Sequence, residues 1–306
     1  MTARPTPVRV LPPTQLGVAE LAGLKRGRTI SVCLPARNEV ATVGPICAQI
    51  VARLMDAEIG KLVDELIVFD DGSTDSTANA ARRNGARVVR VGDVMPSTGP
   101  GRGKGNVLWK SVAESTGDII VWCDTDLTSF TPNYIVRMVT PLLTDDSIDL
   151  VKGFYERPLD TRGDGGGRTT ELAARPLLSR FFPSLATIRQ PLGGECAARR
   201  SLLERLPFVQ GYGVETGLLI DTLRLVGTEC IAQVDLGIRA HRHRSLADLS
   251  EQAAEILAVV LRRVGLEDPA GGQLPPLITA DGSLVEVRVD ERPPLLDIAD
   301  YVAAHT

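Results

Sequence analysis

Short apolar runs and segments of helical spacing alternate along the first half of the chain. Four apolar runs predict buried strands: Thr29 to Leu34, Glu65 to Phe69, Ala86 to Val91 and Ile119 to Trp122. Each of the first three is followed by a segment with helical spacing, which ends near Leu54 in the first case and covers residues 106–115 in the third. This alternation predicts an α/β fold with a doubly wound, mostly parallel sheet of the Rossmann type, whose ligands bind at the carboxyl ends of the strands.

The alternation loosens after about residue 150. Helical spacing covers residues 171–181, 214–226 and 246–264, and residues 232–240 have the pattern of a strand. The last of these helices becomes broadly apolar from Ile256 to Leu261, which indicates burial against the domain or, as a second interpretation, a homodimer contact. We therefore expect four parts: a flexible N-terminal arm (1–28), a nucleotide-binding half (29–150), a second part with helices (151–266) and an extended C-terminal tail (267–306).

The composition limits the partners that the protein can have. A length of 306 residues allows a substantial core, and 24% charged residues with a net charge of −4 give no strongly basic molecule. We therefore expect no nucleic-acid partner, and no stable membrane insertion because no apolar run reaches the roughly 18 residues of a membrane span. The five cysteines are scattered, and Cys33 and Cys123 lie in apolar runs, which favours core thiols in a reducing cytoplasm.

The fourth apolar run ends in two carboxylates, Asp124 and Asp126, separated by Thr125. Two acids at the mouth of a buried strand repel each other unless a cation or a ligand lies between them. Hard oxygen ligands of this kind suit Mg²⁺ or Mn²⁺, which proteins commonly share with substrate phosphates. The pair therefore predicts a metal-bound diphosphate.

Two further polar clusters follow the first and second apolar runs. Pro35-Ala36-Arg37-Asn38-Glu39 lies where α/β folds bind nucleotides, although Asn38 is equally a candidate helix N-cap. In Asp70-Asp71-Gly72-Ser73-Thr74-Asp75 the two adjacent acids exceed what capping of the next helix requires. This excess favours a hydrogen bond from a nucleoside to Asp71 over a purely structural turn.

Gly101-Arg102-Gly103-Lys104-Gly105 resembles a phosphate cradle, because glycines expose backbone N–H groups and Lys104 adds positive charge. The segment is not a P-loop, since Asn106 follows Gly105, and a flexible basic loop is an equal alternative. Glu215 opens an apolar helical segment after Gly211-Tyr212-Gly213. An acid at that position stabilises a helix, and in a sugar pocket it would also accept hydrogen bonds from hydroxyl groups.

Basic residues cluster twice in the second half. Arg168 follows Gly165-Gly166-Gly167, and the segment from Arg239 to Arg244 interleaves three arginines with His241 and His243. The two histidines stand two residues apart beyond a strand and are therefore expected to share a face. A solvated basic turn is the simpler explanation, but a site for a dianionic phosphate and a carboxylate explains the clustering better.

In this order the clusters resemble those of the GT-A glycosyltransferases, with Asp124-Thr125-Asp126 as the D-x-D motif. Four later segments are similar to those of the actinobacterial glucosyl-3-phosphoglycerate synthases: Thr161 to Leu172, Gln190 to Glu195, Gly211 to Glu215 and Arg239 to Arg242. The resemblance covers about residues 29–265. It implies a GT-A sheet followed by an acceptor-binding α+β part, and a retaining, Mg²⁺- or Mn²⁺-dependent transfer of glucose from UDP-glucose to 3-phosphoglycerate. This reaction begins methylglucose lipopolysaccharide synthesis.

The resemblance also implies roles for individual residues. Contacts with the UDP part of the donor are implied for Pro35, Ala36, Arg37, Asn38, Glu39, Asp71, Lys104, Asp124 and Thr125. The glucose pocket is implied for Tyr212, Gly213, Val214 and Glu215, and acceptor binding for Gly167, Arg168, Thr169, Thr170, His243 and Arg244. Metal binding is implied for Asp126 and His241 with Asp124 beside them, and catalysis for Lys104, Glu215 and Leu192.

Two positions depart from the family pattern: His243 stands where Asn is usual, and Asp71 where Ser is frequent. Three alternatives stay open: a mannosyl-3-phosphoglycerate synthase that uses GDP-mannose, an inverting polyprenyl-phosphate glycosyltransferase, and a non-catalytic sugar-nucleotide sensor. The polyprenyl-phosphate enzyme would need membrane association, for which the sequence has neither a spanning segment nor a basic amphipathic helix. The presence of Lys104, Glu215 and His241 beside the acidic pair counts against a sensor.

Overall fold

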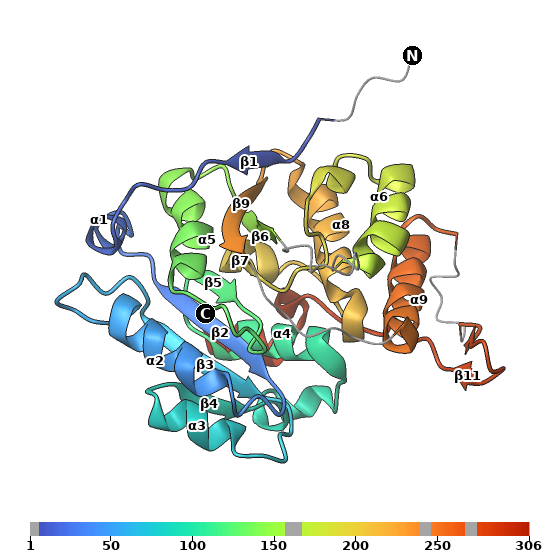
Figure 1. The fold of residues 1–306 in the computed structure, drawn as a ribbon, viewed down its shortest axis with the longest axis horizontal. Helices are drawn as coiled ribbons and strands as arrows, with labels where there is room; N and C mark the ends of the chain where they lie inside the picture. Colours follow the sequence, from blue (N-terminus) through green and yellow to red (C-terminus); the bar gives the residue numbers. More distant parts are fainter. Residues whose placement is uncertain (1–5, 157–166, 239–245, 267–273, 306) are drawn as a thin grey trace, which may run out of the picture.

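The computed structural model describes residues 6–156, 167–238, 246–266 and 274–305. At its centre is an eight-stranded sheet in the order β1-β9-β6-β7-β5-β2-β3-β4 (Figure 1). The strands are β1 (Arg9–Leu11), β2 (Ile30–Ala36), β3 (Glu65–Asp70), β4 (Arg87–Arg90), β5 (Ile119–Trp122), β6 (Leu150–Glu156), β7 (Cys196–Arg199) and β9 (Ile231–Ile238). All of them run parallel except β7, which is antiparallel to both of its neighbours. The predicted α/β class and mostly parallel sheet are therefore confirmed.

The four apolar runs of the first half form β2, β3, β4 and β5. Their continuous Val, Ile, Leu and Phe content suits central strands that are buried on both faces. Val32 and Leu34 pack with the helices of one face, whereas Ile67 and Phe69 pack with those of the other, and all four side chains have 0% exposure. Two hydrophobic layers therefore hold the strands whose carboxyl ends form the site.

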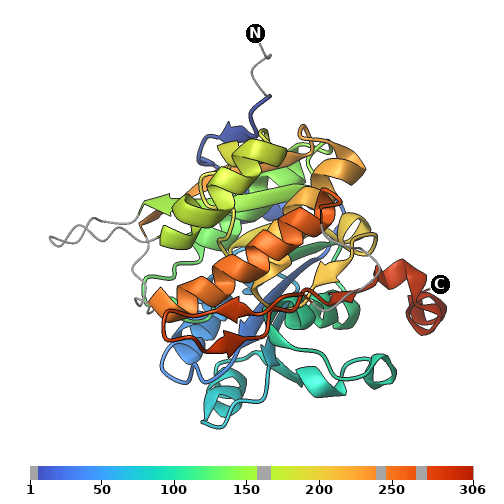
Figure 2. The ribbon, with the colours of Figure 1, turned by 90° about the vertical axis from the view of Figure 1, so that its right-hand side faces the viewer.

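Helices cover both faces of the sheet (Figures 1 and 2). One layer contains α1 (Val18–Gly23), α2 (Val43–Leu54), α3 (Thr77–Arg83) and α5 (Asn133–Thr144). The other contains α4 (Gly103–Glu114), α6 (Arg175–Phe181), α7 (Arg200–Leu203), α8 (Val214–Val226) and part of α9 (Leu246–Arg263). In α9, Ile256, Val259 and Val260 are at most 1% exposed, which confirms burial of its apolar face against the domain.

Strands β6 and β7 were not evident from the sequence pattern. β7 enters the sheet between β5 and β6 with the sequence Cys196-Ala197-Ala198-Arg199, which has none of the β-branched residues that mark the predicted strands. The low β-propensity of this sequence does not by itself favour a strand, so its hydrogen bonds to β5 and β6 must stabilise the extended conformation. This strand continues the segment that begins at Gln190, and it therefore fixes one wall of the site.

The N-terminal segment is part of the sheet and corrects the expectation of a flexible arm. β1 forms the edge strand beside β9, and the preceding residue Val8 is 3% exposed. The Val8 amide donates to Thr187 Oγ1 at 3.0 Å, and the side chain of Leu21 in α1 is completely buried. A three-residue strand obtains its order from its register with β9, which no local pattern in the sequence reveals.

The C-terminal tail also folds onto the domain, in contrast to the expected extended segment. β12 (Glu291–Arg292) pairs antiparallel with β8 (Phe208–Val209), and α10 (Ala299–His305) follows. Trp109 Nε1 of α4 donates to the Pro293 carbonyl at 2.8 Å, and Tyr301 is 3% exposed. A hairpin of β10 (Leu277–Ile278) and β11 (Leu284–Val285) precedes these contacts.

None of the helices in the described ranges is both long and apolar enough to cross a membrane. All five cysteines are free thiols, and Cys33 and Cys123 are completely buried, as their place in apolar runs predicted. Burial raises the pKa of Cys33 to about 12, which keeps that thiol protonated and consistent with a core role.

Candidate active site

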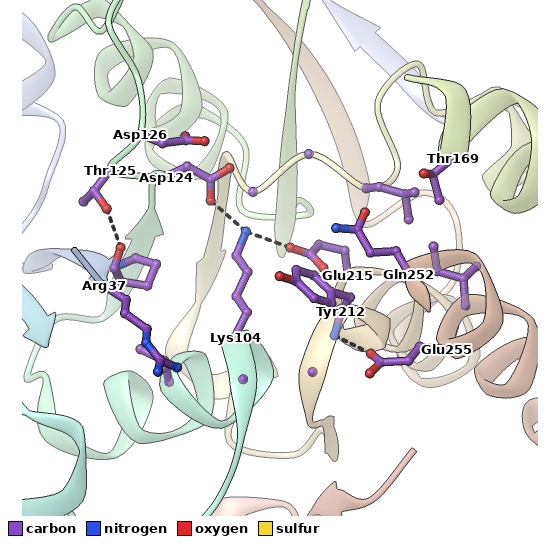
Figure 3. A pocket seen from close by; sticks show the side chains of 18 of the residues that line it. Arg37, Lys104, Asp124, Thr125, Asp126, Thr169, Tyr212, Glu215, Gln252 and Glu255 are labelled. Carbon is purple, nitrogen blue, oxygen red and sulfur yellow. Dashed lines mark hydrogen bonds and ion pairs between the residues drawn. The ribbon is translucent and has the colours of Figure 1, made fainter. Parts of the chain in front are cut away.

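The carboxyl ends of β5, β2 and β3 meet at one edge of the sheet, because the three strands are parallel neighbours. A cavity of about 490 Å³ opens at this edge (Figure 3). It is lined by most of the predicted site residues: Pro35, Ala36, Arg37, Glu39, Asp71, Lys104, Asp124, Thr125, Asp126, Gly167, Arg168, Thr169, Thr170, Leu192, Tyr212 and Glu215. Clusters far apart in the sequence therefore come together around one space.

Lys104 occupies the centre of the cavity, where it projects from the first turn of α4 (Figure 3). Its Nζ atom lies 2.7 Å from Asp124 Oδ1 and 2.9 Å from Glu215 Oε1. Burial alone would lower the pKa of Lys104, but the two carboxylates outweigh this effect and raise that pKa above its usual value. The side chain is therefore a fixed ammonium group between the end of β5 and the start of α8.

The segment Leu192-Gly193-Gly194 lies directly over this ion pair. A Cβ atom at Gly194 would be 2.1 Å from Asp124 Oδ1 and 2.4 Å from Lys104 Nζ, so a larger residue there would displace the ion pair. Beneath the segment, the ammonium of Lys152 donates to the Gly193 carbonyl, and the Lys152 residue is 3% exposed. Glycine packing and a buried lysine thus place Leu192 at the cavity wall.

Asn38 connects the loops that follow β2 and β3. Its backbone has φ +58°, a left-handed conformation that asparagine tolerates, and its Oδ1 accepts from the Thr74 amide at 2.8 Å. The Asn38 amide donates in turn to Ser73 Oγ at 3.0 Å. Helix α2 begins only at Val43, so the N-cap interpretation of Asn38 is wrong. Asn38 does not line the cavity but fixes the loop whose other residues do.

The end of β5 is tied to the end of β2 through Thr125, whose Oγ1 donates to the Pro35 carbonyl at 2.7 Å (Figure 3). Asp71 lies at the neighbouring end of β3. Burial raises the pKa of Asp71, as does the neighbouring Asp70, whereas the Arg37 guanidinium lowers it. A nucleoside group that donates hydrogen bonds to Asp71 would favour its charged form.

Four of the residues that were predicted to bind the acceptor, Gly167 to Thr170, line the opposite wall of the cavity. Thr169 and Thr170 are buried at 9% and 4% exposure, at the start of a helical segment that continues into α6. Within the described part of the chain, the buried Thr169 Oγ1 has no hydrogen-bond partner. A buried hydroxyl without a partner is suited to form a hydrogen bond with a ligand oxygen. Arg168 lines the same wall. His241, His243 and Arg244 lie outside the described residues.

The two carboxylates after β5 suit a divalent cation. Asp124 and Asp126 are both partly exposed and line the cavity that has room for a diphosphate. Carboxylate oxygens are the donors that Mg²⁺ and Mn²⁺ prefer, and such ions complete their shells with water and phosphate oxygens. Among the described residues, no three His, Cys, Asp or Glu side chains gather as a metal site.

Two predicted glucose-pocket residues, Gly213 and Val214, do not line the cavity, and Val214 is completely buried. Sequence reasoning missed several residues that do line it: Val107, Tyr155, Leu249, Gln252, Glu255 and Ile256. The last four lie on one face of α9 at helical spacing. Polar Gln252 and Glu255 on an otherwise apolar face were the available signal.

Glu255 joins the cavity wall to the loop before α4. Its Oε2 accepts from the Tyr212 amide at 2.6 Å, and its Oε1 lies 3.2 Å from Arg102 Nη1. Tyr212 belongs to the 3₁₀ turn Gly211–Gly213 that precedes Glu215. The loop before α4, the turn before α8 and helix α9 are therefore linked by one carboxylate.

Comparison with known proteins shows the family to which the chain belongs. The family described as "Glycosyl transferase family 2" matches residues 31–206. The glucosyl-3-phosphoglycerate synthase of Mycolicibacterium smegmatis is 47% identical over 91% of this chain and 92% of its own, and that of Petrotoga mobilis is 40% identical over 93% and 92%. A crystal structure of the Mycobacterium tuberculosis enzyme with Mn²⁺, UDP-glucose and phosphoglyceric acid has a TM-score of 0.85 and 44% identity, with 96% of this chain and 99% of that chain covered.

The parallel sheet, with an Asp-x-Asp motif at the end of β5 facing a polar cavity, defines a GT-A glycosyltransferase. The chain belongs to glycosyl transferase family 2 and, within it, to the glucosyl-3-phosphoglycerate synthases.

Proposed function

We propose that the protein transfers glucose from UDP-glucose to 3-phosphoglycerate, with release of UDP and with retention at the anomeric carbon. The observation that carries this proposal is the single cavity in which Lys104, Asp124 and Glu215 face the basic, hydroxyl-bearing wall at Arg168 to Thr170. The two relatives named above are glucosyl-3-phosphoglycerate synthases by name, and the similar solved structure contains Mn²⁺, UDP-glucose and phosphoglyceric acid; the similarity covers nearly the whole chain. A donor half and an acceptor half therefore meet where the reaction requires them.

Lys104 is placed to stabilise the leaving group. Negative charge develops on the diphosphate as the bond between the anomeric carbon and the UDP oxygen breaks, and a fixed ammonium group in a partly buried site stabilises it. When bound at Asp124 and Asp126, Mg²⁺ or Mn²⁺ would supply further Lewis-acid charge to the same phosphates. The carboxyl ends of β2 and β3 and the residues that follow them would hold the uridine, through Pro35, Ala36, Arg37, Glu39 and Asp71.

Glu215 is suited to hold the sugar rather than to attack it. Its side chain is 10% exposed and bonded to Lys104, which fixes one carboxylate oxygen and leaves the group beside Tyr212 to accept from glucose hydroxyls. The acceptor hydroxyl would attack the anomeric carbon from the face that UDP leaves, and its proton would pass to a departing phosphate oxygen. Arg168, Thr169 and Thr170 would orient that acceptor through its phosphate and carboxylate oxygens.

An assay of UDP release tests the proposal. With Mn²⁺ or Mg²⁺ and UDP-glucose, we expect release that depends on added 3-phosphoglycerate, and proton NMR of the product should show an α-linked glucose. GDP-mannose supplied as a competing donor should be used poorly. The absence of acceptor-dependent release from folded protein would refute the assignment, and preferred use of GDP-mannose would replace it with mannosyl transfer.

A cytoplasmic location and a homodimer belong to the same proposal. The five free thiols suit a reducing compartment. Light scattering at several protein concentrations would measure the oligomeric state.

A further inference from the structure

A buried arginine from the C-terminal tail contacts the loop before α4. Arg292 is 7% exposed and donates from Nε to Asn106 Oδ1 at 2.9 Å. Its two terminal nitrogens donate to the carbonyls of Thr98 at 2.6 Å and Gly99 at 2.9 Å. The planar guanidinium thus satisfies three acceptors on both ends of the glycine-rich segment, a geometry that a lysine ammonium does not reproduce.

The sequence of the loop is adapted to this contact. A Cβ atom at Gly101 would lie 1.9 Å from Asn106 Oδ1 and 2.5 Å from Arg292 Nη2, so a larger residue there would displace the Asn106 and Arg292 side chains. The Arg292 guanidinium also lies over the Trp109 ring at 5.3 Å from its centroid. The glycine that sequence analysis interpreted as part of a phosphate cradle therefore serves, at position 101, to admit Arg292.

The tail holds Arg292 in place on independent contacts. Pairing of β12 with β8 fixes its backbone, and Trp109 Nε1 donates to the next residue's carbonyl at 2.8 Å. A second contact links the same segment to the loop, since Arg102 Nη2 donates to the Arg288 carbonyl at 2.5 Å. Figure 2 shows this C-terminal segment (red) passing beside α9 on its way to the C-terminus.

Arg292 reaches the donor site only through other residues. It does not line the cavity, but Asn106 lies two positions after Lys104 in the first turn of α4. A first turn held by Arg292 keeps Lys104 directed at Asp124 and Glu215. We propose that Arg292 is a positioning residue for donor binding, which sets the glycine-rich loop and, through it, the ammonium that faces the diphosphate. This inference rests on the proposed role of Lys104 in the donor site.

Three variants of the full-length protein test the inference: Arg292→Ala, Arg292→Lys and, as a matched control, Arg288→Ala. The Arg288 side chain is exposed and pairs with Glu286, whereas only its backbone carbonyl contacts the loop. For each variant we would measure the Kd of UDP with Mn²⁺ by calorimetry, the KM of both substrates, and the thermal midpoint. We expect Arg292→Ala to raise the UDP Kd and the UDP-glucose KM about tenfold, with the 3-phosphoglycerate KM changed less than about twofold.

Arg292→Lys should fall between the wild type and Arg292→Ala, and it carries the test if the alanine variant does not fold. Arg288→Ala should match the wild type. Equal increases in both KM values, or a lower thermal midpoint with an unchanged UDP Kd, would make Arg292 merely structural and overturn the inference. Calorimetry with UDP does not need turnover, so a wild-type protein that is inactive on 3-phosphoglycerate would refute the proposed reaction while the Kd comparison still decides the role of Arg292.

Discussion

Lys104 shows how much of the site depends on one side chain. Its ammonium is the counter-charge of Asp124 at the end of β5 and of Glu215 at the start of α8. Because these carboxylates raise its pKa above the usual value, Lys104 stays charged through neutral pH although it is largely buried. A positive group so placed can both bind a diphosphate and offset the repulsion between two neighbouring acids.

We predict that Lys104→Met lowers kcat at least about 100-fold, because the leaving group loses a fixed positive charge. The variant should also lose about 1–2 kcal/mol of stability, a partial cost because the groups keep some contact with solvent. Mn²⁺ should restore part of the lost stability, because it replaces the missing positive charge at Asp124. Activity assays and thermal unfolding with and without Mn²⁺ measure both effects.

Lys110→Met is the matched control for that experiment. Lys110 lies on the same helix, is 2% exposed, does not line the cavity, and donates to the Val91 carbonyl at 2.9 Å. It should lose stability without recovery by Mn²⁺ and keep its kcat within about twofold. Similar behaviour of the two variants would contradict a specific role for Lys104.

At the scale of elements, the sequence predicts those helices and strands whose own residues have a clear hydrophobic pattern. β2, β3 and β5 are continuous apolar runs, and their polar ends meet because parallel neighbours end at one edge. β7 and β12 were not predicted, because each is stabilised by its pairing partners rather than by its own sequence. These partners are β5 and β6 for β7, and β8 for β12. Helix α9 was predicted, but its polar side chains were not assigned to the site, since periodicity alone does not tell which cavity a face meets.

Glu255 is the clearest of these missed side chains, because it holds both the Tyr212 amide and Arg102. We predict that Glu255→Gln lowers kcat/KM for UDP-glucose about tenfold, since a neutral amide no longer balances Arg102 and holds the 3₁₀ turn less firmly. Steady-state kinetics at fixed 3-phosphoglycerate would measure this. Glu251→Gln, one turn earlier on α9 and exposed, serves as the control. Equal effects in the two variants would exclude a specific role for Glu255.

At the scale of the whole molecule, both terminal segments pack on the domain that contains the site. The tail packs on α4 and on the loop before it, whereas the N-terminal segment forms one edge of the sheet beside β9. β9 is paired with β6 on its other side, so without β1 it would become the edge strand. The N-terminal segment is therefore expected to protect an edge rather than to take part in catalysis.

We predict that deletion of residues 1–11 destabilises the protein by about 2–4 kcal/mol, because it removes the buried Val8 and the pairing of Arg9 to Leu11 with β9. It also removes the ion pair of Arg9 with Asp145, which is exposed and contributes little. Urea unfolding would measure the loss, and light scattering would report association through the uncovered edge of β9.

Deletion of residues 1–5 leaves Val8 and β1 intact and should behave as the full chain does. In the sheet order, β9, β6 and β7 separate β1 from β5, the strand that Asp124 follows. The KM values should therefore stay within about twofold in whatever fraction remains folded; a selective change in either KM would instead connect the N-terminal segment to the site.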